Sequence, residues 1–136
     1  MEAKDFIIID DDRISTLICE ECLNAVFPDN TICKFDNPVD ALMHLGMEYG
    51  EGKIHKPTLL FLDIYMPAMN GWEFLECYSN FDEKIKNQIK IIVLSSSADL
   101  DDKKRAMANI YVSEFMVKPL RQDVLHFILT KYKKAA

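Results

Sequence analysis

The chain has 136 residues, of which 49% are hydrophobic and 28% are charged, so we expect residues 1–136 to form one folded domain. The formal net charge is −6 and no basic stripe is present, which argues against direct binding to nucleic acid. No apolar run approaches the roughly 20 residues of a membrane helix, and the N-terminus lacks the pattern of a signal peptide. By default we therefore expect a cytoplasmic protein without membrane insertion.

Five short apolar runs predict β-strands along the chain. Three of them are apolar throughout, as in strands that are covered on both faces of a sheet. The second and the fifth contain more polar residues and suit the two edges of the sheet. In chain order, the predicted strands are residues 6–9, 31–35, 59–62, 91–94 and 111–117.

Helical patterns occupy the segments that follow these runs. Apolar residues recur on one helical face over residues 13–27, and Asn37 followed by Pro38 is typical of a helix start. The alternation of five strands with five helices predicts an α/β fold, in which a doubly wound parallel sheet carries helices on both faces. The predicted helices are residues 13–27, about 38–47, about 71–78, about 99–109 and about 121–133.

Two of the four cysteines have the CxxC spacing that is common in metal sites. Cys19 and Cys22 lie inside the first predicted helix, without a second pair or a nearby histidine in the sequence. Structural zinc sites usually have four well-spaced ligands, so buried or half-buried thiols are the better interpretation.

Polar side chains that could take part in a reaction follow four of the predicted strands. The first strand ends at Asp10 and Asp11 and the third at Asp63, while the fourth ends at serines that begin with Ser95. The fifth ends at Lys118. The carboxyl ends of parallel strands share one edge of the sheet, which is where open α/β sheets bind their ligands.

These side chains together suit phosphoryl transfer. If the first and third strands are neighbours, their carboxylates repel one another, and a magnesium ion with waters and phosphoryl oxygens relieves that repulsion. Lys118 could pair with a phosphoryl oxygen, and Ser95 could donate a hydrogen bond to another. Asp63 is the natural nucleophile, because a carboxylate can form an acyl phosphate.

Each of these residues alone also has a structural interpretation. Asp12 is expected to cap the helix that follows it, and Asp10 or Asp11 could do the same. Asp63 could begin a turn, and serines and Lys-Pro pairs are common in loops. Their occurrence in order, after four different strands, favours a shared site.

The same residues give the chain a resemblance to the receiver domain of two-component response regulators, over residues 5–130. That family has paired aspartates after its first strand, then an aspartate followed by x-x-Met-Pro-x-Met-(Asp/Asn)-Gly. A Thr or Ser follows a later strand, and a Lys-Pro pair closes the set. The chain matches this pattern at Asp10 and Asp11, at residues 63–71, at Ser95 and at Lys118-Pro119.

By this resemblance, Asp63 accepts a phosphoryl group from a phosphohistidine on a histidine kinase or a histidine phosphotransfer protein. The resemblance also implies that Mg²⁺ is bound by the side chains of Asp10, Asp11 and Asp63 and by the main-chain carbonyl of Tyr65. It implies a flavodoxin-like sheet with strand order 2-1-3-4-5. The chain would be a phosphoacceptor rather than an enzyme with its own substrate, with weak autophosphatase activity.

The resemblance also implies that Ser95 and Lys118 contact the phosphoryl oxygens and that the Lys118-Pro119 peptide bond is cis. Ser96 is the alternative hydroxyl, because counting back from Lys118 at the commoner spacing ends there. We prefer Ser95 because it directly follows the last apolar residue of its strand. One extra residue would then have to be accommodated later, for example near residues 109–111.

Phe115 has two interpretations, a core residue or a switch residue that turns inward when Ser95 moves toward the phosphoryl group. Phosphorylation would then change the surface of the fourth helix, fifth strand and fifth helix. The signal would pass to a downstream effector protein, or the phosphoryl group would pass to a phosphotransfer domain, and the sequence does not choose between these routes. A phosphatase with an aspartyl-phosphate intermediate is another hypothesis. Such enzymes often carry an aspartate two residues after the nucleophile, where this chain has Tyr65.

Overall fold

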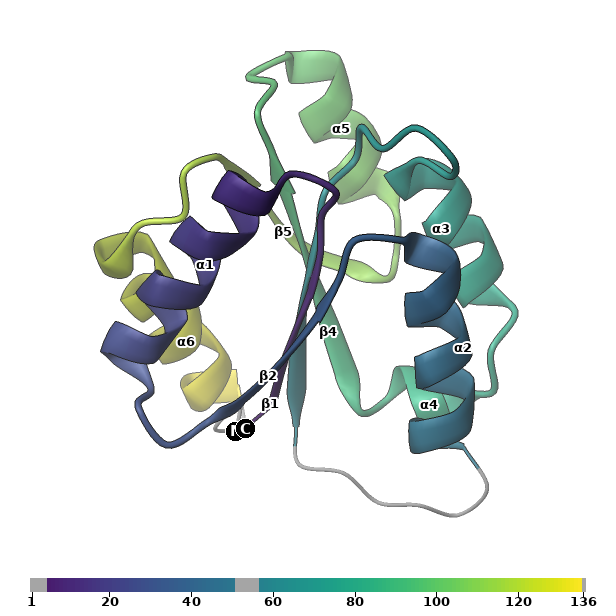
Figure 1. Cartoon of the computed structure of the whole chain (residues 1–136), viewed down its shortest axis with the longest axis horizontal. Coiled ribbons are helices and arrows are strands. Elements are labelled where there is room, and N and C mark those ends of the chain that lie inside the picture. The colour runs from purple at the N-terminus through teal and green to yellow at the C-terminus, as the bar shows by residue number, and fades with distance from the viewer. Residues whose placement is uncertain (1–4, 51–56, 136) are drawn as a thin grey trace.

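A computed structural model describes residues 5–50 and 57–135, so the remaining residues of the expected 1–136 domain lie outside the described part. Five strands form one parallel sheet with the order β2-β1-β3-β4-β5 (Figure 1). This confirms the predicted α/β fold, with the flavodoxin-like order 2-1-3-4-5. The strands are β1 (Asp5–Ile9), β2 (Thr31–Phe35), β3 (Thr58–Leu62), β4 (Ile89–Ser95) and β5 (Val112–Val117).

Helices cover both faces of this sheet. In Figure 1, α1 and α6 lie on the left-hand face, and α2 and α3 lie on the right-hand face. The sequence predicted five of the helices within a few residues of their ends, and it missed the single turn α4. The helices are α1 (Arg13–Val26), α2 (Pro38–Tyr49), α3 (Gly71–Ser79), α4 (Glu83–Lys86), α5 (Leu100–Ala108) and α6 (Gln122–Ala135). Among the described residues, none of the helices combines the length and the hydrophobicity of a membrane-spanning segment.

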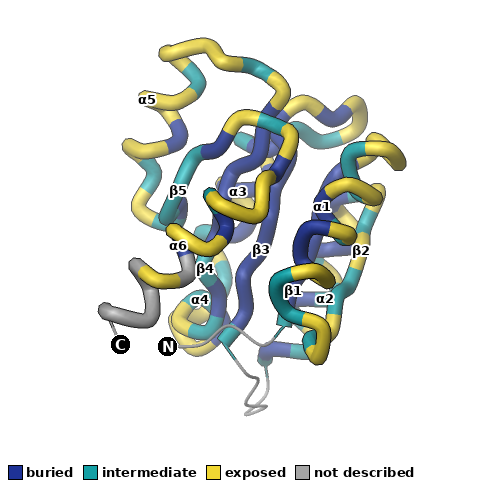
Figure 2. The backbone as a smooth tube through the Cα atoms, turned by 90° about the vertical axis from the view of Figure 1, so that its left-hand side faces the viewer, coloured by how far each residue is buried: buried dark blue, intermediate teal, exposed yellow. Residues whose placement is uncertain are grey.

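The hydrophobic core has two layers, one on each side of the sheet. Alternate residues of β1 belong to different layers, because successive side chains of a strand point to opposite faces of the sheet. Phe6 and Ile8 pack with α1 and α6, whereas Ile7 and Ile9 pack with α2, α3 and α5. All five residues of β3 are buried, while every residue of the edge strand β2 is half-buried or exposed (Figure 2). This explains why the β3 run is apolar without alternation.

The ends of α1 and α3 are fixed by polar side chains. Asp12 caps α1, because its carboxylate accepts hydrogen bonds from the amides of Ile14 and Ser15. Asn70 forms a capping box with Glu73 at the start of α3. The predicted capping role of Asp12 is therefore confirmed, and both helices start at defined points beside the carboxyl edge of the sheet.

A β-bulge lies in the edge strand β5. Ile91 of β4 is opposite Val112, but the next residue, Ile92, is opposite Glu114, so Ser113 is the extra residue. The extra residue that the family spacing led us to expect near residues 109–111 stays a prediction, and the bulge lies a few positions later in the chain. A bulge at an exposed edge strand leaves no apolar signature in the sequence. Beyond the bulge the pairing is regular, and it aligns Ser95 with Val117.

The four cysteines are free thiols with different exposure. Cys19 and Cys22 are buried between α1 and the sheet, as the sequence predicted. Burial raises the pKa of the Cys19 thiol far above its ordinary value. Cys33 is half-buried in β2, whereas Cys77 is exposed on α3.

Candidate functional site

The carboxyl ends of β1 and β3 bring three aspartates together. Ile9 and Leu62 are opposite each other in neighbouring strands, so the residues that follow them, Asp10 and Asp63, lie side by side. The amide of Asp63 donates a hydrogen bond to the carbonyl of Ile9 (2.9 Å), which continues the strand pairing into the site. Asp10, Asp11 and Asp63 each present a carboxylate oxygen, and these oxygens all lie within 4.8 Å of one another.

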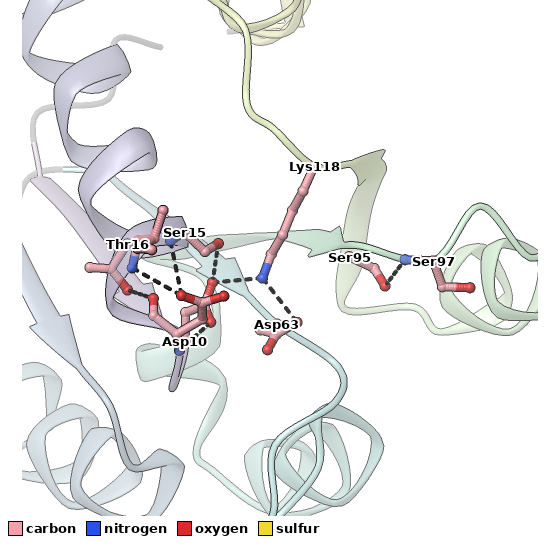
Figure 3. A network of polar contacts seen from close by, with 9 residues as sticks. Asp10, Ser15, Thr16, Asp63, Ser95, Ser97 and Lys118 are labelled. Carbon is pink, nitrogen blue, oxygen red and sulfur yellow. Dashed lines mark hydrogen bonds and ion pairs between the residues drawn. The ribbon is translucent and has the colours of Figure 1, made fainter.

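Lys118 provides a positive charge at this cluster. Its Nζ lies 2.8 Å from Oδ2 of Asp10 and 3.4 Å from Oδ1 of Asp63. Figure 3 shows the lysine side chain extending from the segment after β5 toward both carboxylates. Because β4 lies between β3 and β5 in the sheet, the long side chain reaches past β4 to contact these carboxylates. The structure therefore brings together four of the site residues that the sequence singled out.

Burial controls the ionisation of the central groups. Loss of solvent, followed by the negative charge of Asp10, raises the pKa of Asp63 to about 6, although Lys118 opposes this shift. Burial alone would lower the pKa of Lys118, but its hydrogen bond to Asp10 and the charges of both aspartates keep that pKa above its ordinary value. Near pH 7 Asp63 is therefore mostly ionised, and it lies beside the ammonium group of Lys118.

Asp10 has a network of its own with the start of α1. Its Oδ1 accepts a hydrogen bond from the amide of Asp12 (3.0 Å), and its Oδ2 accepts one from the hydroxyl of Ser15 (2.6 Å). Sequence reasoning missed Ser15. The available signal was a hydroxyl residue in the first turn of the helix that begins directly after the acidic run.

Ser95 is the last residue of β4 and is completely buried. Its carbonyl accepts a hydrogen bond from the amide of Lys118 (2.7 Å), and its hydroxyl accepts one from the amide of Ser97 (3.1 Å; Figure 3). Ser96, the alternative hydroxyl, is exposed in the loop that follows. The strand pairing thus puts Ser95 next to the segment that carries Lys118.

The loop after β3 is connected to α5 through side chains. Tyr65 is more than half exposed, and its hydroxyl donates a hydrogen bond to the carboxylate of Asp102 in α5. One turn further along α5, the guanidinium of Arg105 lies 4.3 Å from the centre of the Trp72 ring in α3. Phe115 lies in β5, half-buried against the core layer that contains α2, α3 and α5.

The end of this loop requires a glycine at the start of α3. A Cβ atom on Gly71 would lie 2.6 Å from the side chain of Ile64 and 2.9 Å from the carbonyl oxygen of Asp63. The amide of Gly71 also donates a hydrogen bond to the carbonyl of Ile64 (2.7 Å). The glycine that ends the motif of residues 63–71 therefore lets the loop close tightly behind Asp63.

The donor set fits a hard divalent cation. Three carboxylates supply oxygen ligands, and two of them, Asp10 and Asp63, are buried at the edge of the sheet. Magnesium prefers oxygen ligands and usually binds through one or a few carboxylates with waters and phosphoryl oxygens. An open groove of about 490 Å³ beside Asp10 and Asp11, between α1 and the end of β2, leaves one side of the cluster accessible.

The sequence matches the family model of the response regulator receiver domain over residues 6–130. The chain belongs to this family. It is therefore a receiver domain of the kind found in two-component response regulators, a family of phosphoacceptors rather than classical enzymes, whose acidic pocket binds Mg²⁺. No curated protein was found to match this sequence.

Solved structures of receiver proteins have the same fold as this receiver domain. A response regulator receiver protein from Dyadobacter fermentans is 29% identical, with a TM-score of 0.85 and coverage of 96% of this chain and 98% of that one. A two-component response regulator from Cytophaga hutchinsonii is 26% identical, with a TM-score of 0.84 and coverage of 96% and 97%. The fold is also shared by the receiver domain of Ssk1 from Saccharomyces cerevisiae, solved with the histidine phosphotransfer protein Ypd1. That match has 19% identity, a TM-score of 0.73 and coverage of 96% and 88%.

Proposed function

We propose that Asp63 is the phosphoacceptor of this receiver domain and takes its phosphoryl group from a phosphohistidine. The donor is a histidine kinase or a histidine phosphotransfer protein, and residues 1–136 act as one receiver domain in the cytoplasm. The observation that carries the proposal is the cluster of three aspartates with Lys118. In this cluster the buried carboxylate of Asp63 lies next to charged groups that could bind a metal ion and a phosphoryl group.

In the proposed reaction, an ionised carboxylate oxygen of Asp63 attacks the phosphorus of the phosphohistidine. An oxygen–phosphorus bond forms, the phosphorus–nitrogen bond breaks, and the imidazole leaves. With its pKa raised to about 6, Asp63 is mostly ionised near pH 7 and can act as the nucleophile. Burial of this side chain also limits the water that could compete for the phosphoryl group.

Asp10, Asp11, the side chain of Asp63 and the main-chain carbonyl of Tyr65 are the proposed Mg²⁺ ligands. When bound, the ion neutralises charge between these carboxylates and the phosphoryl oxygens. Lys118 would exchange its contacts with the carboxylates for a phosphoryl oxygen, because it is already within 3.4 Å of Asp63.

We further propose that phosphorylation is read through Ser95. Its hydroxyl accepts a hydrogen bond from Ser97 in the structure described here, and it would turn to donate one to a phosphoryl oxygen. That movement would shift the loop before α5 and let Phe115 move deeper into the core layer. The surface of α5, β5 and α6 would then present a different face to a downstream effector protein.

A phosphohistidine donor is supported by two observations. The groove beside α1 is lined by Asp10 and Asp11, so a partner's histidine could approach the acidic cluster from that side. The yeast receiver domain that shares this fold was solved with a histidine phosphotransfer protein. The chain is expected to lose its phosphoryl group by weak autophosphatase activity and not to turn over small phosphomonoesters.

Labelling with acetyl phosphate tests the proposal. Intact mass spectrometry should find one added phosphoryl group on the wild-type protein in Mg²⁺, and none on Asp63→Asn or after chelation. Asp36→Asn is the matched control, because Asp36 also directly follows a strand but is exposed and outside the cluster. An Asp63→Asn protein that is labelled like the wild type would overturn the assignment. Multiple turnover of a small phosphomonoester would favour a phosphatase instead.

A further inference from the structure

We infer that Ser15 is a positioning residue whose hydroxyl orients the Asp10 carboxylate for Mg²⁺, so that Ser15 sets the affinity of the site for the ion. The inference rests on the proposed function and concerns the same site. It assigns a task to a side chain that lies outside the acids, serine and lysine of the family pattern.

The contacts of Asp10 carry the argument. Within the described part of the chain, Oδ2 of Asp10 is shared by two donors, the hydroxyl of Ser15 at 2.6 Å and the ammonium of Lys118 at 2.8 Å. The other oxygen, Oδ1, accepts the amide of Asp12 at 3.0 Å. Donors on both oxygens fix the rotation of the carboxylate, and two of the three come from the start of α1 (Figure 3).

The hydroxyl of Ser15 is itself held in place. The carboxylate of Asp12 caps the helix and accepts the amides of Ile14 and Ser15 at 2.9 and 3.3 Å. The backbone of Ser15 is therefore tied to the acidic segment at the same turn from which its side chain bonds to Asp10. A group on a capped helix keeps its position better than one on a free loop, which is what a support for a metal ligand needs.

The position of Lys118 determines the sign of the effect. The ammonium of Lys118 and the hydroxyl of Ser15 approach the same oxygen of Asp10. The hydrogen bond from the serine therefore opposes the electrostatic attraction of the carboxylate toward the lysine. Without the hydroxyl, Oδ2 would keep the contact with Lys118 and Oδ1 would keep the amide of Asp12, but no side chain of α1 would oppose a shift of the carboxylate toward the lysine. The carboxylate would then be held less firmly in the orientation that it shares with Asp11 and Asp63. Partners that hydrogen-bond to metal-binding carboxylates typically change metal affinity by about 10- to 100-fold when removed.

The test is a titration of the whole chain with MgCl₂, followed by the amide NMR shifts of residues next to Asp10, Asp11 and Asp63. Ser15→Ala should need about tenfold more Mg²⁺ for half-saturation than the wild type. Ser15→Thr keeps a hydroxyl and should stay within about twofold of the wild type. Thr16→Ala is the matched control, because the neighbouring hydroxyl of Thr16 donates to the main-chain carbonyl of Asp12 (3.0 Å) and, among residues 5–50 and 57–135, to no carboxylate.

A second readout separates positioning from general damage. The rate of labelling by acetyl phosphate should show the same tenfold shift in Mg²⁺ requirement for Ser15→Ala, yet approach the wild-type rate at saturating Mg²⁺. A Ser15→Ala protein whose Mg²⁺ requirement is within twofold of the wild type would overturn the inference. An increase in the Mg²⁺ requirement of Thr16→Ala as large as that of Ser15→Ala would also overturn it. If the wild-type protein neither binds Mg²⁺ nor becomes labelled, the proposed function itself fails, which distinguishes the two failures.

Discussion

Replacing the buried carboxylate of Asp63 by an amide should stabilise the ion-free protein. Folding raises the pKa of this group from 3.8 to about 6, mainly through burial, so its ionised form is disfavoured in the folded state. A shift of about 2 pKa units corresponds to at most about 3 kcal/mol at about 1.4 kcal/mol per unit. Because solvent and relaxation reduce such effects, we expect Asp63→Asn to raise the free energy of unfolding by about 1–3 kcal/mol at pH 7.5.

The pH dependence follows from the direction of this shift. Between about pH 4 and pH 6, the folded wild-type protein retains a proton on Asp63 that the unfolded chain has lost, so this group's contribution to stability falls as the pH rises. Below this window Asp63 is protonated in both the folded and the unfolded state. The difference in the free energy of unfolding between the wild type and Asp63→Asn should then vanish. Above it the difference should be constant.

The assay is urea unfolding in chelator at pH 4.5, 5.5, 6.5 and 7.5, followed by circular dichroism. Asp36→Asn serves as the control, because an exposed carboxylate should change stability by less than about 0.5 kcal/mol. Adding Mg²⁺ should stabilise the wild type more than Asp63→Asn and narrow the gap. Equal stability of the two proteins at pH 7.5, or a gain that is as large at pH 4.5, would refute the electrostatic explanation.

Three further changes test the rest of the site. Lys118→Ala removes the ammonium 3.4 Å from Asp63, so the pKa of Asp63 should rise above about 6 in a carbon-detected NMR titration. An unchanged or lower pKa would contradict the ion pair. Gly71→Ala forces a methyl group to within 2.9 Å of the Asp63 carbonyl and should cost about 1–3 kcal/mol in thermal or urea unfolding, whereas a neutral result would mean that the loop can open. Arg105→Ala removes the cation 4.3 Å from Trp72 and should shift the tryptophan emission to longer wavelength, more than Arg105→Lys does; equal spectra would argue against the stacked contact.

The sequence alone was sufficient to predict the parallel sheet and the proximity of the aspartates at its carboxyl edge. Parallel strands that are covered on both faces must be apolar throughout, so β1, β3 and β4 were visible as uninterrupted runs. Residues directly after neighbouring parallel strands meet at one edge of the sheet, which is why the sequence pattern could group Asp10, Asp63 and Lys118. The Lys118-Pro119 bond is cis, as the resemblance implied.

Other features could not be predicted, because they are too short to show a pattern or depend on packing between distant segments. The turn α4 has only four residues, too few for a helical period, and only Asp82 as its cap indicates it. The contact of Tyr65 with Asp102 joins residues 37 positions apart on exposed surfaces, where no apolar pattern exists to indicate it.

The position of the switch hydroxyl illustrates the limit of counting along the chain. Spacing in the sequence could not decide between Ser95 and Ser96, because a bulge changes the number of residues without changing the distance covered. The bulge at Ser113 lies between Ser95 and Lys118, and the sheet pairing brings Ser95 beside the segment that carries the lysine. The functional role of Ser95 stays a prediction.

The unequal exposure of the cysteines has a practical consequence for spectroscopy. Cys19 and Cys22 are buried, and burial also raises the thiol pKa of Cys33, which slows its reaction with alkylating reagents. A maleimide fluorophore should therefore attach first to Cys77, on the outer side of α3. The natural chain thus offers a labelling point on the helix that begins just behind Asp63, without any engineered substitution.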